Sequence, residues 1–137
     1  MPLIAIAWLI GLACDGPHSN PLDDPSWHAP ARAIIQAATS RFPKGTATTE
    51  AQRSLAASGF SCVTRPAVTD NAIFDSFARG LRAGTAAGDA QVLRGPFLLC
   101  TRWEGGANGI PSRHVGLYLL IGDGGRVGDI AVDVLNF

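Results

Sequence analysis

The sequence of 137 residues contains little charge. Asp, Glu, Lys and Arg make up 16% of it, and the formal net charge is zero. Nucleic-acid binding needs clustered Lys and Arg to neutralise phosphates, so we expect no nucleic-acid partner. No Gly-Lys-Ser/Thr phosphate loop is present, and the three histidines show no metal-ligand spacing with cysteines or carboxylates. We therefore expect neither a cofactor nor a metal.

Long hydrophobic runs are also lacking. The apolar run at residues 2–13, PLIAIAWLIGLA, is shorter than the ~20 residues that cross a bilayer core. It has the length of the apolar region of a signal peptide. Residues 14–29 are polar and contain three prolines, which disfavour regular structure. The sequence predicts a signal peptide over residues 1–13 and a flexible linker over residues 14–29.

The end of the apolar run resembles the lipobox of bacterial lipoproteins, in Gly11-Leu12-Ala13-Cys14. In that class the cysteine is acylated and becomes the first residue of the mature protein. The resemblance implies lipidation of Cys14 and a lipid-anchored protein on the periplasmic side of the bacterial cell envelope, at the inner or the outer membrane. The alternative is an N-terminal strand or helix with an ordinary buried cysteine.

Cysteine is scarce, with three in the chain. If Cys14 carries lipid, Cys62 and Cys100 remain as a pair that can form a disulfide outside the cytoplasm. Two buried free thiols are the alternative. We expect the disulfide together with export.

Residues 30–137 are predicted to form a single α+β domain. Apolar residues at helical spacing predict a helix from Pro30 to Phe42, and Thr46 and Gly59 mark the ends of a second helix over residues 47–58. We expect these two helices to pack on one face of a three- to four-stranded antiparallel sheet, whose other face is more open. Residues 70–82 predict a further helix, as an insertion.

The C-terminal residues predict a β-hairpin around Asp123-Gly124, a favoured two-residue turn. This turn predicts four cross-strand pairs: Val115 with Val132, Leu117 with Ile130, His114 with Asp133, and Tyr118 with Asp129. One face of the hairpin is then apolar and the other is mostly polar.

The stretches FPKGTATTEAQRSLAASGFSC, LLCTR and RHVGLYLLIGDGGRVGDIAVDV resemble the SmpA/OmlA (BamE) family of small bacterial lipoproteins. That fold is shared with the repeats of beta-lactamase inhibitor protein. The matching features are Gly45-Thr46, Gly59 and the terminal hairpin. The resemblance implies an envelope protein that works by contacts with another protein and is not an enzyme.

Three residues are candidates for contact with that partner. Trp103 precedes a Gly-rich loop and could anchor a protein, although an ordinary rim or core aromatic is the alternative. Arg102 and Arg113 could meet an acidic partner or lipid head groups, and solvated surface charge is the alternative.

Two other functions stay open. One is a secreted soluble inhibitor or ligand-binding domain of similar fold. The other is a small hydrolase in which Asp133 orients His114 as a general base. The hydrolase is disfavoured because no serine or cysteine has the sequence context of a nucleophile.

Overall fold

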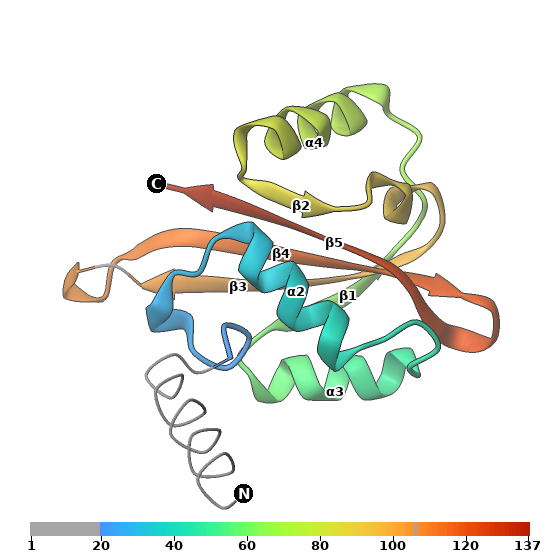
Figure 1. The fold of residues 1–137 in the computed structure, drawn as a ribbon, viewed down its shortest axis with the longest axis horizontal. Coiled ribbons are helices and arrows are strands. Elements are labelled where there is room, and N and C mark those ends of the chain that lie inside the picture. Colours follow the sequence, from blue (N-terminus) through green and yellow to red (C-terminus); the bar gives the residue numbers. More distant parts are fainter. Residues whose placement is uncertain (1–19, 106) are drawn as a thin grey trace, which may run out of the picture.

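The computed structural model describes residues 20–105 and 107–137 as an α+β domain with helices packed on an antiparallel sheet (Figure 1). The fold class is therefore confirmed. The sheet has five strands in the order β1-β3-β4-β5-β2, one more than the upper end of the expected range. The strands are β1 (Ser61–Arg65), β2 (Ala86–Gly88), β3 (Phe97–Gly105), β4 (Pro111–Gly122) and β5 (Arg126–Asn136).

The extra strand, β2, has no strand pattern in the sequence. Its three residues are two alanines and a glycine, so they carry no alternation of apolar and polar side chains. These residues form a strand because they pair with β5, where Ala87 lies opposite Val132.

Helices α2 (Ala31–Arg41) and α3 (Thr48–Ala57) cover one face of the sheet, as expected (Figure 1). Ile34 and Leu55 are fully buried against Leu117 in the main core. Gly59 has φ +93° and ends α3 in the left-handed conformation that glycine favours, and the Phe60 N–H then donates to the Leu55 carbonyl at 2.9 Å.

The predicted start of α3 is wrong by one residue. Ala47 is the N-cap and makes no side-chain hydrogen bond to the helix. The hydroxyl of Thr46 donates instead to the carbonyl of Pro43, at 2.7 Å. The threonine therefore stabilises the turn between the helices rather than the helix end.

Helix α4 (Asn71–Ala83) confirms the predicted helical insertion. The Asp70 side chain caps it by accepting from the Ala72 N–H at 2.9 Å. Phe77 of α4 packs with Leu93 and Phe97 in a second core, on the face of the sheet opposite α2 and α3. The face that we expected to be open is thus covered over part of its area.

The hairpin of β4 and β5 has the predicted faces but a different register. Its turn has three residues, Asp123–Gly125, and two residues of β5, Gly128 and Asp129, lie opposite the single residue Leu120. This bulge shifts the register by one further residue, so that the total shift is two and the same side chains still face the core. The pairs are Leu117 with Val132, Val115 with Val134, His114 with Leu135 and Tyr118 with Ala131. The four predicted pairs are wrong.

Residues 20–29 are packed against the domain, so the expectation of a flexible linker is wrong for this part of residues 14–29. Leu22 is fully buried in the main core, and Ala29 is buried beside it. Asp24 caps a short 3-10 helix at Pro25–Trp27 by accepting from the Ser26 N–H. The prolines here set turns that fit the core, whereas composition alone indicates only irregular structure. Residues 14–19 lie outside the described part.

Candidate functional site

Arg102 and Arg113, two of the candidate partner contacts, are buried on the face of the sheet that α2 and α3 cover. On β3, Arg102 lies two residues from the buried Cys100, and on β4, Arg113 lies two residues from the buried Val115. Each arginine therefore shares a face of its strand with a core residue. Glu104 lies between them and is 2% exposed. The interpretation of these arginines as surface contacts is therefore wrong.

Glu104 forms an ion pair with each arginine, which leaves the cluster with one net positive charge, and the two arginines fix the N-terminal segment. Glu104 Oε2 lies 2.8 Å from Arg102 Nη2, and Glu104 Oε1 lies 3.0 Å from Arg113 Nε. Arg102 donates to the carbonyls of Pro21, Leu22 and Ser58, and Arg113 donates to those of His28 and Ala29. Burial lowers the pKa of Arg113, and Glu104 opposes this shift. The cluster is a structural clamp on residues 21–29.

Trp103, the third candidate, lies on the opposite face and is 59% exposed. It pairs across the strands with His114, which pairs in turn with Leu135. Its ring centroid lies 4.4 Å from that of His114 and 5.6 Å from that of Phe137, which is 75% exposed. We call these four residues, Trp103, His114, Leu135 and Phe137, the Trp103 surface. Because no described element covers it, a partner can contact these apolar side chains.

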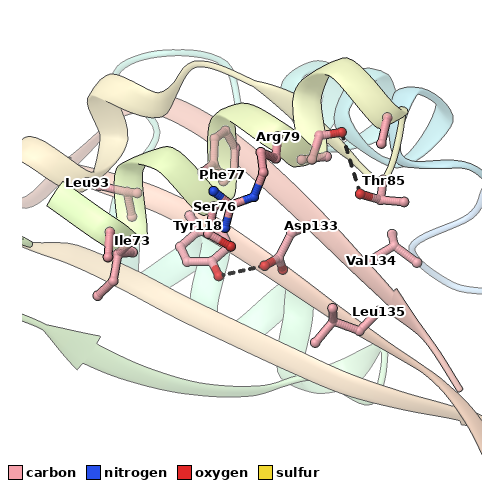
Figure 2. A pocket seen from close by; sticks show the side chains of 14 residues that line it. Ile73, Ser76, Phe77, Arg79, Thr85, Leu93, Tyr118, Asp133, Val134 and Leu135 are labelled. Atoms are coloured by element: carbon pink, nitrogen blue, oxygen red, sulfur yellow. Dashed lines mark hydrogen bonds between the residues drawn. The ribbon is translucent and has the colours of Figure 1, made fainter. Parts of the chain in front are cut away.

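A cavity of about 460 Å³ lies beside this surface, between α4 and the sheet (Figure 2). Leu135 belongs to both. Apolar residues from α4, β2, β5 and the 3-10 helix at Ala90–Arg94 form most of its lining: Ala72, Ile73, Phe77, Ala83, Ala86, Leu93, Val134 and Leu135. The size is that of a small-molecule site.

Tyr118 and Asp133 form a polar pair in the cavity. The Tyr118 hydroxyl donates to Asp133 Oδ2 at 3.1 Å (Figure 2). Burial raises the pKa of Asp133, and the hydrogen bond from Tyr118 and the nearby His114 oppose this shift only in part. Burial also raises the pKa of Tyr118, so the phenol stays protonated and remains a donor.

Gly116 makes room for the Asp133 carboxylate. The two residues are paired across β4 and β5, and a Cβ on Gly116 would lie 2.5 Å from Asp133 Oδ1. Only glycine therefore lets the carboxylate lie over the strand at this place, which explains an otherwise costly glycine inside a strand.

Arg79 of α4 also lines the cavity. Figure 2 shows its side chain reaching from the helix toward the side of the cavity where Tyr118 lies. Within the described residues it makes no hydrogen bond or ion pair with Asp133 or any other group. The cavity thus contains one cation and one carboxylate that are not bound to each other.

The geometry does not support the general-base pair that the sequence suggested. His114 lies opposite Leu135, and the Asp133 carboxylate is bonded to Tyr118. Among the described residues, no hydrogen bond joins His114 to Asp133 or to a serine, threonine or cysteine. The predicted pairing of His114 with Asp133 is wrong.

Cys62 and Cys100 lie opposite each other on β1 and β3, with their sulfurs 2.09 Å apart, at disulfide distance. The predicted pairing is confirmed. Cys14 and the predicted signal peptide lie outside the described residues. Within the described part no helix is long and apolar enough to cross a membrane, and no group of three or more potential ligands could hold a metal ion.

Three residues that these sites contain were not among the predicted site residues: Glu104, Tyr118 and Arg79. A signal for Glu104 was present, because Leu98, Cys100, Arg102 and Glu104 alternate on one strand and must share a face. Arg79 carried no signal, since only the packing of α4 on the sheet places it in the cavity. Comparison with models of protein families, with curated proteins and with solved structures finds no match to this chain.

Proposed function

We propose that this protein is a non-catalytic protein-binding module of the bacterial cell envelope, anchored to a membrane by acyl chains on Cys14. Its partner is an envelope protein that docks on the Trp103 surface. The observation that carries the proposal is the exposure of Trp103 beside Phe137 and Leu135 at one end of the sheet.

The Trp103 surface has the composition of a binding hot spot. Trp is enriched among residues that dominate binding energy, because its large ring buries much apolar area at little cost in side-chain entropy. Three large exposed apolar side chains are gathered here on neighbouring strands and at the C-terminal residue, while single exposed apolar residues are common on any protein. A partner that covers them gains free energy from burial.

The envelope location rests on other features. The lipobox-like residues before Cys14 support export, and the Cys62–Cys100 pair fits an oxidising compartment, where disulfides persist. The resemblance to the BamE family belongs to this proposal and carries the same expectation of function by contact.

Site-specific photocrosslinking in intact bacterial cells tests the docking surface. We would replace Trp103 with p-benzoylphenylalanine, and place the same residue at Arg53, which is exposed on α3 on the other face, as the matched control. We expect a discrete adduct with another protein from position 103 and none from position 53. Equal adducts at both positions, no adduct at 103, or an adduct only with a second copy of this chain would contradict the proposal.

A secreted ligand-binding domain is the second candidate. The cavity beside α4 favours it, because its volume and mostly apolar lining are those of small-molecule sites. Release of the mature protein into the medium without an acyl group would distinguish this candidate from the first.

A further inference from the structure

We propose that the cavity between α4 and the sheet binds a small zwitterion with an apolar side chain, the chemistry of a free hydrophobic amino acid. The ligand's ammonium group would contact Asp133, its anionic group would contact Arg79, and its side chain would pack among the apolar lining residues. This proposal does not rest on the docking proposed for the Trp103 surface, although Leu135 belongs to both places.

The floor of the cavity is suited to a cation. The Asp133 carboxylate accepts from the Tyr118 hydroxyl, and the backbone N–H groups of Asp133 and Gly116 also stabilise it, but no Lys or Arg lies within ion-pair distance among the described residues. Asp133 is half-buried, and even partial burial of a carboxylate without a counter-charge has a cost, part of which an ammonium group that donates to it recovers. His114 is the other titratable group that acts on Asp133, but its ring lies against Trp103.

The wall formed by α4 is suited to an anion. Arg79 lines the same cavity, and its guanidinium has no partner among the described residues. A planar guanidinium binds carboxylates through two parallel hydrogen bonds. Arg79 is exposed, so it can adjust its side chain to a ligand without a large cost in burial.

The two charges together select for a zwitterion. A simple amine would meet Asp133 but would be repelled by Arg79, and a simple carboxylate would meet Arg79 but would be repelled by Asp133. In a zwitterion, the ammonium group contacts Asp133 and the carboxylate contacts Arg79, so neither charge is repelled by an adjacent like charge. The apolar lining, with Phe77 standing edge-on to Tyr118, supplies the contact for its side chain.

Three small molecules that share a phenyl ring test this assignment. Each is titrated into the isotope-labelled full-length protein and followed by nuclear magnetic resonance. The probes are L-phenylalanine, phenethylamine, which lacks the carboxylate, and 3-phenylpropionate, which lacks the ammonium. We expect phenylalanine to shift amide signals of α4, β4 and β5 in a saturable way. Each analogue should bind about tenfold more weakly, the loss expected for one charge-assisted hydrogen bond.

Two variants should each remove one part of this selectivity. Asp133→Asn keeps the shape and an acceptor for Tyr118, and it should bind phenylalanine and 3-phenylpropionate equally well. Arg79→Gln should bind phenylalanine and phenethylamine equally well. Arg82→Gln is the matched control, because Arg82 lies on the same helix outside the cavity lining, and it should keep the wild-type pattern.

No saturable shifts with phenylalanine, or equal binding of all three probes to the wild type, would overturn the proposal. Selectivity that persists in both Asp133→Asn and Arg79→Gln would overturn it as well. Circular dichroism checks that each variant is folded, and the exposed Arg79 site keeps the test valid if Asp133→Asn does not fold. These results do not depend on the crosslinking experiment, so the two proposals can fail separately.

Discussion

At the scale of residues, burying the Arg102–Glu104–Arg113 cluster has a cost that its ion pairs and its hydrogen bonds to backbone carbonyls offset. Burying a charge removes it from water, and ion pairs compensate for this only when every member has a partner. Glu104 contacts both guanidinium groups, and the terminal Nη donors reach carbonyls of residues 21–29 and of Ser58, whereas the buried Arg102 Nε has no hydrogen-bond partner among the described residues. The cluster therefore couples the sheet to the N-terminal segment.

Glu104→Ala should lower the free energy of unfolding by about 3–5 kcal/mol, because it leaves two buried cations without their carboxylate. Urea unfolding followed by tryptophan fluorescence measures the change. Asp75→Ala on the exposed part of α4 is the control, and it should stay within about 0.5 kcal/mol of the wild type. Equal stability of Glu104→Ala and the wild type would show that the clamp is unimportant.

Asp133 makes stability depend on pH in a defined direction. Burial raises its pKa above the ordinary value of 3.8, so the folded state holds the proton more tightly than the unfolded state. Its favourable contribution is full below pH 3.8 and is lost as pH rises through the raised folded pKa. We expect Asp133→Asn to become progressively more stable than the wild type as pH rises across this window, measured by urea unfolding at each pH.

The pKa of Asp23 is shifted in the opposite direction, so this residue is a control for the pH dependence expected from Asp133. Hydrogen bonds from Arg41 and then Ser58 lower its pKa, so its contribution is full above the ordinary value of 3.8 and is lost as pH falls through the lowered one. Asp23→Asn should therefore be less stable than the wild type near neutral pH, and the gap should close in acid. The same slope for both variants would refute the assignment of these two carboxyls.

At the scale of elements, the sequence predicted the structure best where a local rule decides it. The helical spacing from Ile34 to Phe42 and the glycine at position 59 place α2 and the end of α3 correctly. The register of the hairpin was wrong because it depends on a three-residue turn and on the bulge at Gly128 and Asp129. Neither has a local signature strong enough to compete with Asp-Gly in a two-residue turn. The α4–sheet cavity was missed for a related reason, since it arises from contacts between distant elements.

The edge strand β1 depends on its link to β3. It has five residues, most of them exposed, and among the described strands it pairs with β3 alone. The Cys62–Cys100 bond closes a loop across a sequence separation of 38 residues. We expect its reduction to lower the free energy of unfolding by about 3–4 kcal/mol in the chain-entropy model.

Urea unfolding with and without dithiothreitol measures this loss, and Cys62→Ser should reproduce most of it. Cys14→Ala is the control, because Cys14 is not part of the pair, and its stability should match that of the wild type. A reduced wild type as stable as the oxidised one would mean that β1 is held by strand pairing alone.

At the scale of the whole molecule, the Trp103 surface and the N-terminal segment of residues 20–29 lie at the same end of the sheet. The segment of residues 20–29, the turn between β3 and β4 and the C-terminus lie there together (Figure 1). Because residues 21–29 are clamped to the domain, only the five residues 15–19 separate Cys14 from Asn20, and the six Cα-to-Cα steps between them span at most ~20 Å when fully extended. An acylated Cys14 would therefore hold the Trp103 surface close to the membrane, and a partner there would itself be close to the membrane.

The intact mass of the protein recovered from bacterial membranes tests this arrangement. We expect the wild type to lack residues 1–13 and to carry an acyl increment, and we expect Cys14→Ala to show neither change and to leave the membrane fraction. The physical reason is that each buried CH₂ of an acyl chain contributes ~0.8 kcal/mol to membrane binding, which the alanine variant cannot replace. A full-length wild-type chain without acyl mass would remove the anchor from the proposed function. The Trp103 surface and the cavity beside α4 would then belong to a module whose location has to be sought elsewhere.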